Sequence, residues 1–314
     1  MYVNLVLKQG SEIRELWSKA PFAVTFKVYV FNITNPDDVV QGKKPHVKQI
    51  GPYIFDEWKY KSDLVDNDKD DTVAFDMMNR FIFRPDLTME AAGLTGNEIV
   101  TMPHLLIMAG LIAVQRDKAP LLNLATKAMT QIFKPTSPFL TARAMDILFD
   151  GIGIDCTSEE FEAKSFCSVM EGEKAIKVVN ETYMLFSILG GANATSMGRF
   201  EVYRGIKNIH QLGEVVKIND ETEVDAWDGE CNKILGTDST IFAPFHAKSD
   251  VLYAFAPDLC RSLGASYVRP SSYDGIPTGF YTIDFGDLKS DPSQHCFCRD
   301  QDVDKCPPKG TLDL

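Results

Sequence analysis

A cluster of three cysteines towards the C-terminal end constrains this chain more than any other feature. Cys296 and Cys298 are separated by one residue, and Cys306 follows after seven intervening residues. This spacing is poor for a tetrahedral zinc site, which usually takes C-x₂₋₄-C pairs, so no metal site is predicted. We expect the two thiols of this C-x-C pair to bond to different partners. The cluster therefore predicts disulfide bonds and an oxidising compartment.

Three Asn-x-Thr sequons favour the same compartment. They begin at Asn32, Asn180 and Asn193. A single sequon often occurs by chance, but three of them beside clustered cysteines favour a lumenal or extracellular chain over a cytosolic one with free thiols. We expect glycans at all three positions. Asn193 has the most loop-like context, whereas Asn32 ends an expected strand, so we expect it to be partly buried.

The chain has an odd number of cysteines, seven in total. Four lie outside the cluster: Cys156, Cys167, Cys231 and Cys260. An odd cysteine in a secreted chain indicates a free thiol, an intermolecular bond or a partner outside the sequence. Cys156 and Cys167 either bridge each other or remain buried thiols. The first residues, Met1–Leu7, lack the basic and long apolar regions of a signal peptide, so we expect the targeting segments outside this sequence.

The composition is that of a globular protein that can bury a substantial core, with 314 residues, 45% of them hydrophobic and 24% charged. The net charge is −12, from 44 acidic and 32 basic residues, which argues against nucleic acid as a partner. The longest nearly unbroken apolar run, Leu105–Val114, has about ten residues, whereas a membrane-spanning helix needs about 20. No transmembrane segment is therefore predicted within these residues.

Hydrophobic periodicity predicts an α+β fold. Apolar residues recur at helical spacing in Glu12–Lys19, and Phe22–Phe31 alternates as a strand with one apolar face, formed by Phe22, Val24, Phe26, Val28 and Val30. Further strands are expected at Ile50–Phe55, Tyr183–Ile188, Phe200–Tyr203, Val215–Ile218, Val251–Phe255 and Phe280–Phe285. These short strands predict a mainly antiparallel sheet or barrel.

Residues 102–150 interrupt the β pattern with three expected helices. Apolar runs cover His104–Val114, Leu121–Phe133 and Phe139–Phe149, and prolines separate them. We expect a helical bundle that buries its own apolar stripes. The alternative is that part of its surface faces a ligand entrance or a membrane.

No sequence motif indicates catalysis or cofactor binding. The chain lacks G-x-S-x-G, Walker A, H-E-x-x-H and complete G-x-G-x-x-G patterns, and its five histidines are scattered. The acidic run Asp66–Asp71 resembles the start of an EF-hand loop, but aspartate replaces the glycine at position six and Met77 replaces the glutamate at position twelve. We interpret this run as a solvated turn. The prediction is a protein that is not an enzyme and has no cofactor.

Several stretches together resemble the CD36 family of scavenger receptors. They are Phe26–Asn35, Ile50–Tyr53, Cys231–Asp238, Leu259–Ser262 and Cys296–Cys298. The resemblance covers essentially the whole chain. Three more stretches are most similar to the insect sensory neuron membrane proteins of this family, particularly their type 1 group: Gly93–Gly96, Ala144–Gly151 and Asp304–Gly310.

The resemblance implies a single domain over residues 1–314, which is an ectodomain fragment without its C-terminal part. Its fold would be a mainly antiparallel β-barrel crossed by a hydrophobic tunnel, with residues 102–150 as an apical helical bundle. One transmembrane helix would precede the fragment and one would follow it, so the fragment would be extracellular at the cell membrane.

The resemblance also implies a function without enzymatic turnover. The chain would belong to a membrane-bound lipid or odorant receptor, or transfer protein, in olfactory neurons. It would pass fatty-acid-derived pheromones through the tunnel to an odorant receptor complex, with a pheromone-binding protein as an additional partner. The alternative is a general scavenger or lysosomal receptor for lipid, lipoprotein or protein ligands.

Particular residues take roles from the same resemblance. The family pattern pairs Cys231 with Cys296 and Cys298 with Cys306, and leaves Cys260 for a cysteine past Leu314. An ungapped comparison puts Lys134 opposite the apical ligand-binding lysine of the family's scavenger receptor. We expect Lys134 to attract a carboxylate headgroup while three neighbouring apolar residues receive the tail: Ile132, Phe133 and Phe139.

Overall fold

The structure of the chain is a computed structural model that describes residues 5–134, 136–173, 175–300 and 302–311. The chain divides into two units, each with its own buried clusters. The first unit comprises residues 1–22, 59–78 and 196–314, and the second comprises residues 23–58 and 79–195. The long strands β2 (Val47–Asn67) and β3 (Thr72–Phe83) contribute residues to both units.

In the first unit, β9 (Ser196–Tyr203) pairs antiparallel with residues 72–78 of β3 and with β10 (Val215–Ile218). Helix α1 (Glu12–Ser18) brings Trp17 to this sheet, where its ring meets Phe75 edge-on with centroids 5.0 Å apart. Phe75 and Phe200 are fully buried and stack with centroids 5.9 Å apart. Aromatic packing therefore forms the centre of this core.

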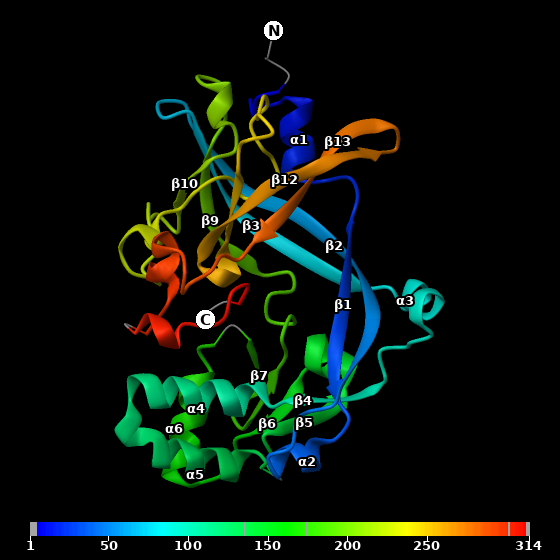
Figure 1. Cartoon of the computed structure of the whole chain (residues 1–314), viewed down its shortest axis with the longest axis vertical. Coiled ribbons are helices and arrows are strands. Elements are labelled where there is room, and N and C mark those ends of the chain that lie inside the picture. The colour runs from blue at the N-terminus through cyan, green and yellow to red at the C-terminus, as the bar shows by residue number, and fades with distance from the viewer. Residues whose placement is uncertain (1–4, 135, 174, 301, 312–314) are drawn as a thin grey trace. The chain divides into compact units, whose positions relative to one another are not determined.

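A second sheet of the first unit is formed by β11 (Leu252–Ala256), β12 (Arg261–Tyr273) and β13 (Ile276–Asp284), all antiparallel. Strands β12 and β13 form the long hairpin drawn in orange in Figure 1. Strand β12 was not predicted, because Gly264 and Pro270 are residue types that strands disfavour.

In the second unit, β1 (Val24–Ile33) pairs antiparallel with residues 47–57 of β2. Val30 is buried and Phe26 and Val28 are half-buried, so the predicted face is confirmed for these three residues, whereas Val24 is exposed and Phe22 precedes the strand. Two small antiparallel sheets complete the strands: β4 (Ile99–Pro103) with β5 (Phe139–Arg143), and β6 (Ile152–Asp155), β8 (Tyr183–Phe186) and β7 (Ile176–Asn180) in that order.

Three helices of the second unit pack together: α4 (Leu105–Asp117), α5 (Leu122–Ile132) and α6 (Phe161–Met170) (Figure 1). Helix α5 buries the apolar stripe that the sequence predicted, including Ala125, Ala128, Met129 and Ile132. Two shorter helices, α2 (Pro36–Val40) and α3 (Pro85–Ala92), each begin at a proline. Proline suits the first helical position because its missing N–H would have no partner there.

The third helix expected within residues 102–150, at Phe139–Phe149, was wrong in its first half. Phe139–Arg143 is strand β5, in which Ala142 pairs with Val100 and the Thr141 and Thr101 hydroxyls lie 2.8 Å apart. Residues 144–150 are helical, with a π-helix at Asp146–Asp150. The third helix that packs in this unit comes later in the chain, at α6, where Ala163, Cys167 and Met170 are buried at helical spacing.

The expected β-barrel is also corrected in part. The strands are mostly antiparallel, as predicted, but the described residues form open sheets and no closed barrel. The tunnel and the apical role of the helices stay predictions. Among the described residues, no helix combines the length and the apolar character needed to cross a membrane.

The acidic run Asp66–Asp71 is more than the solvated turn that was expected. Both carboxylate oxygens of Asp66 bind the Arg14 guanidinium, at 2.7 and 2.8 Å. The Arg204 guanidinium lies 3.0 Å from Asp66 and 3.2 Å from Asp71, whose side chain is only 5% exposed. Two buried arginines therefore neutralise these acids, which sequence spacing alone did not reveal.

Candidate functional site

A cavity of about 620 Å³ in the second unit, the Lys134 cavity, contains all the residues predicted to bind ligand. It is bounded by α2, the end of α5, the start of β5, and strands β6 and β8. Its lining comprises Pro36, Asp37, Val40, His104, Ile132, Phe133, Lys134, Ser137, Phe139, Leu140, Thr141, Ile152, Gly153, Asp155 and Tyr183. These segments are far apart in sequence, so the cavity exists only in the folded unit.

The four predicted residues differ in how they reach this cavity. Ile132 ends α5 and Phe133 follows it, and both are buried, at 4% and 6% exposure. Phe139 begins β5 and is half-buried, whereas Lys134 is exposed. The apolar side chains form one wall beside a lysine that water reaches. That arrangement suits a ligand with an apolar body and a polar head, and binding by these residues stays a prediction.

His104 is a cavity residue that the sequence did not single out. It caps the N-terminus of α4, since its Nδ1 accepts a hydrogen bond from the Ile107 backbone N–H at 3.4 Å. Its ring also meets Phe133 edge-on, with centroids 4.8 Å apart. Burial lowers the pKa of the imidazole below its usual 6.5, so the ring is neutral at pH 7. A neutral ring adds no positive charge to the cavity.

The charges around the cavity are mixed. Lys134 is the single lysine of the lining, and Asp37 and Asp155 are its two carboxylates. Hydrogen bonds from Thr157 hold the pKa of Asp155 below its usual value, and the positive charge of Lys134 adds to this effect. Asp155 is therefore ionised at pH 7. One cation against two anions leaves the lining at −1, so Lys134 attracts a carboxylate headgroup less than an isolated lysine would.

Tyr183 completes one side of the cavity. It begins β8 opposite Asp155 of β6, and a Cβ added to Gly153 would lie 2.2 Å from its hydroxyl oxygen. Glycine at position 153 therefore allows the Tyr183 ring to lie against β6. A sequence signal existed here, because an isolated glycine within a strand pattern indicates close approach of another group.

The structure contains three disulfides. It joins Cys231 to Cys296 and Cys298 to Cys306, with Cα atoms 5.7 and 5.6 Å apart. It also joins Cys156 to Cys167, the pair that the sequence left open, and so ties α6 to the end of β6. Cys260 is exposed and carries no disulfide in the described chain, and its pairing with a cysteine past Leu314 stays a prediction. No group of described side chains has the composition of a metal site.

The three sequon asparagines have different surroundings. Asn180 is exposed, and its side-chain oxygen accepts hydrogen bonds from the Thr182 backbone and hydroxyl. Asn32 is half-buried, and its oxygen accepts from the Thr101 backbone at 2.7 Å. Asn193 lies in a turn at residues 191–194, so its expected loop-like context is confirmed, but its amide bonds the Phe81 backbone on β3 through both its oxygen and its nitrogen.

We expect glycan occupancy to be highest at Asn180. A glycan replaces a hydrogen on the amide nitrogen of asparagine. In Asn193 this nitrogen donates a hydrogen bond to the Phe81 backbone, whereas in Asn180 only the side-chain oxygen is hydrogen-bonded within the sequon. Mass spectrometry of glycopeptides from insect-cell material measures the occupancy of each site. The Asn180→Gln variant is expected to lose most of the glycan mass. Higher occupancy at Asn193 than at Asn180 would contradict this ordering.

Comparison with known proteins matches the whole chain, residues 1–314, to the CD36 family. Sensory neuron membrane protein 1 of Aedes aegypti is 53% identical over 315 residues, which cover 100% of this chain and 58% of that protein. The protein of the same name from Anopheles gambiae is 53% identical, over 99% of this chain and 56% of its own length.

A more distant relative gives the same result. Sensory neuron membrane protein 1 of Mamestra brassicae is 42% identical, over 99% of this chain and 59% of that protein. The chain thus spans a little more than half the length of these relatives. The resemblance predicted from the sequence is confirmed: the chain belongs to the CD36 family.

Proposed function

We propose that this chain is the extracellular, ligand-binding part of a membrane receptor or transfer protein for fatty-acid-derived pheromones in olfactory neurons. The observation that carries the proposal is the meeting of Ile132, Phe133, Lys134 and Phe139 around one cavity of about 620 Å³. Family membership supports a lipid-related membrane receptor, and the relatives' name, sensory neuron membrane protein, supports the cell type.

The physical need for such a protein follows from the hydrophobic effect. An aliphatic pheromone gains about 0.8 kcal/mol for each methylene that leaves water. It loses that gain if it must cross water again to reach its receptor. A protein that holds the chain against apolar walls keeps the gain during transfer. Binding and release are sufficient for this role, so the proposal includes no enzymatic turnover.

The proposed partners follow from the same role. The protein would receive the pheromone from solution or from a pheromone-binding protein and pass it to an odorant receptor complex in the same membrane. We propose that Lys134 orients the headgroup at the cavity while Phe133 and Phe139 contact the chain. A tunnel leading onward from the cavity is part of this proposal.

A second candidate is a general scavenger or lysosomal receptor for lipids, lipoproteins or proteins. The matched family model supports it as well, because family membership alone does not distinguish these roles. Expression confined to antennal neurons favours the pheromone role, whereas broad expression in gut or haemocytes favours the scavenger role.

The direct test compares cells that express a pheromone receptor complex with and without the full-length protein containing this chain. We expect the protein to lower the pheromone concentration that gives a half-maximal response. A version carrying Lys177→Ala should give the same response as the unaltered protein, because Lys177 is an exposed lysine of β7 outside the cavity lining. Equal sensitivity with and without the protein would contradict the proposed function.

A further inference from the structure

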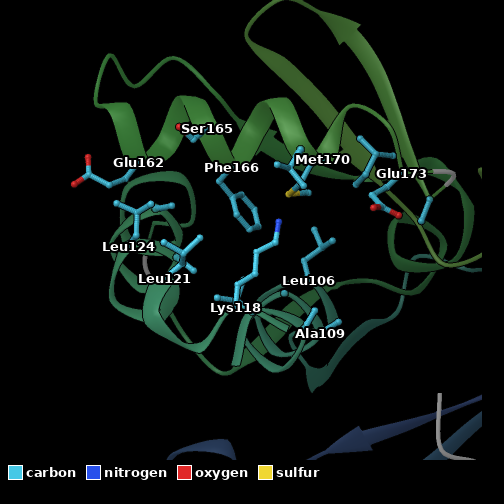
Figure 2. A pocket seen from close by; sticks show the side chains of 18 residues that line it. Leu106, Ala109, Lys118, Leu121, Leu124, Glu162, Ser165, Phe166, Met170 and Glu173 are labelled. Atoms are coloured by element: carbon cyan, nitrogen blue, oxygen red, sulfur yellow. The ribbon is translucent and has the colours of Figure 1, made fainter. Parts of the chain in front are cut away.

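A second cavity, the inter-helix cavity, lies in the second unit between α4, α5 and α6 and has a volume of about 490 Å³ (Figure 2). It shares no lining residue with the Lys134 cavity. Its volume falls within the range of about 300–1,000 Å³ that is usual for small-molecule sites. The two cavities are therefore separate candidate sites.

Small side chains create the space between these helices. The lining includes five residues without large side chains: Ala109, Gly110, Ala113, Ala125 and Ala128. Leu106, Leu124, Phe166 and Met170 provide the larger apolar walls. Protein interiors are normally packed with few voids larger than a water molecule. An apolar space of this size is therefore suited to an apolar guest, which would gain free energy by leaving water.

One lysine enters this apolar space. Figure 2 shows the Lys118 side chain extending from the end of α4 towards Phe166 and Met170. Among the described residues, Lys118 forms no ion pair, so its ammonium group is available to a ligand. The two glutamates of the lining, Glu162 and Glu173, lie at opposite ends of the cavity (Figure 2).

We propose that the inter-helix cavity binds a neutral aliphatic molecule with a terminal carbonyl oxygen, such as a long-chain ester or aldehyde. The chain contacts the apolar walls, and Lys118 donates a hydrogen bond to the carbonyl oxygen. A carboxylate head at Lys118 would gain less than it would from an isolated lysine, because Glu162 and Glu173 give the lining a formal net charge of −1. The carbonyl oxygen gains the same donor without that repulsion.

Photolabelling locates the ligand. The probe is dodecyl acetate with a diazirine on its alkyl chain, irradiated with the purified chain and mapped by mass spectrometry. We expect labels on cavity-lining residues of α4 and α6, including Leu106 and Phe166. Labels confined to the Lys134 cavity would overturn the proposal.

Two tryptophan variants provide a matched pair on α4. Ala113 lines the cavity from an exposed position, so Ala113→Trp fills the space without displacing the core, and we expect it to reduce labelling at least tenfold. Ile112 is 58% exposed and outside the lining, so Ile112→Trp should label like the wild type. Wild-type labelling of Ala113→Trp, or an equal loss in both variants, would overturn the proposal.

The Lys118→Met variant tests the headgroup contact at an exposed residue that the fold does not depend on. It keeps an apolar chain of similar length but removes the donor. We expect dodecyl acetate to bind about fivefold more weakly, as for loss of one hydrogen bond, while dodecane binds as to the wild type. Dodecanoic acid should compete less well than dodecyl acetate. Unchanged binding of dodecyl acetate to Lys118→Met, or stronger competition by the acid, would overturn the assignment of a neutral ligand.

Discussion

Asp238→Ala is expected to destabilise the first unit by about 3–5 kcal/mol, because it leaves a buried ammonium group without its counter-charge. Lys61 and Asp238 side chains are only 2% and 1% exposed, and their charged atoms lie 3.3 Å apart. Lys61 also donates to the Thr240 hydroxyl at 2.9 Å and lies 4.5 Å from the centre of the Trp17 ring. Burial lowers the pKa of Lys61, and Asp238 opposes that fall. Urea unfolding measures the loss.

The double variant Lys61→Met/Asp238→Leu separates the charge effect from packing. It removes both charges, so we expect it to be more stable than Asp238→Ala alone. Lys233→Met is the matched control, since Lys233 pairs with Glu230 at the exposed surface, where such pairs contribute little. A loss below about 1 kcal/mol for Asp238→Ala would contradict the view that this pair is buried and coupled.

Asp66→Asn is expected to lower the free energy of unfolding at pH 7 by about 3 kcal/mol. Asp66 accepts hydrogen bonds from Arg14 and Arg204, whose side chains are 9% and 6% exposed. Burial alone would raise the pKa of Asp66, but the hydrogen bonds and charges of the two arginines outweigh it and lower the pKa below its usual 3.8. The variant leaves both arginines without the acid that they share.

The pH dependence follows from the direction of this shift. Because the folded pKa of Asp66 lies below the unfolded value, its contribution is complete above about pH 4 and is lost as the pH falls through the folded pKa. Unfolding measured from pH 7 to pH 2 should therefore converge for wild type and Asp66→Asn at the acid end. Asp70→Asn is the control, because Asp70 is exposed and bonds only Asn67 among the described residues. A constant difference between wild type and Asp66→Asn at every pH would contradict this account.

Elements with strong local patterns were predictable from the sequence. Helix α5 carries an apolar stripe at 3.6-residue spacing, and β1 alternates apolar and polar side chains, so both appear where the pattern indicated. Phe139–Arg143 is also apolar, but its pairing with β4 decides its conformation, and that partner lies about 40 residues earlier. A short apolar run is equally consistent with a helix or a strand when its pairing partner is unknown.

In the candidate site too, the part set by local sequence was predictable and the part set by long-range packing was not. Ile132, Phe133, Lys134 and Phe139 lie within eight positions of one another, so their proximity was predictable from the chain. Asp37, His104 and Asp155 reach the cavity through the fold, and no local pattern connects them with Lys134. Their charges change the expected chemistry, because two of them are carboxylates. Long-range packing therefore determines the electrostatics of a site whose apolar part local sequence already indicates.

The measurement that tests the central claim most directly is the binding of a long-chain fatty acid and of its neutral acetate to variants of the Lys134 cavity. We expect Lys134→Ala to weaken fatty-acid binding about tenfold, as for loss of a charge-assisted hydrogen bond, and to weaken acetate binding less. Asp155→Asn removes an anion from the lining and should strengthen fatty-acid binding, with Lys177→Ala as the unchanged control. Equal losses for both ligands in Lys134→Ala, or no loss for either, would contradict a role for Lys134 in ligand binding.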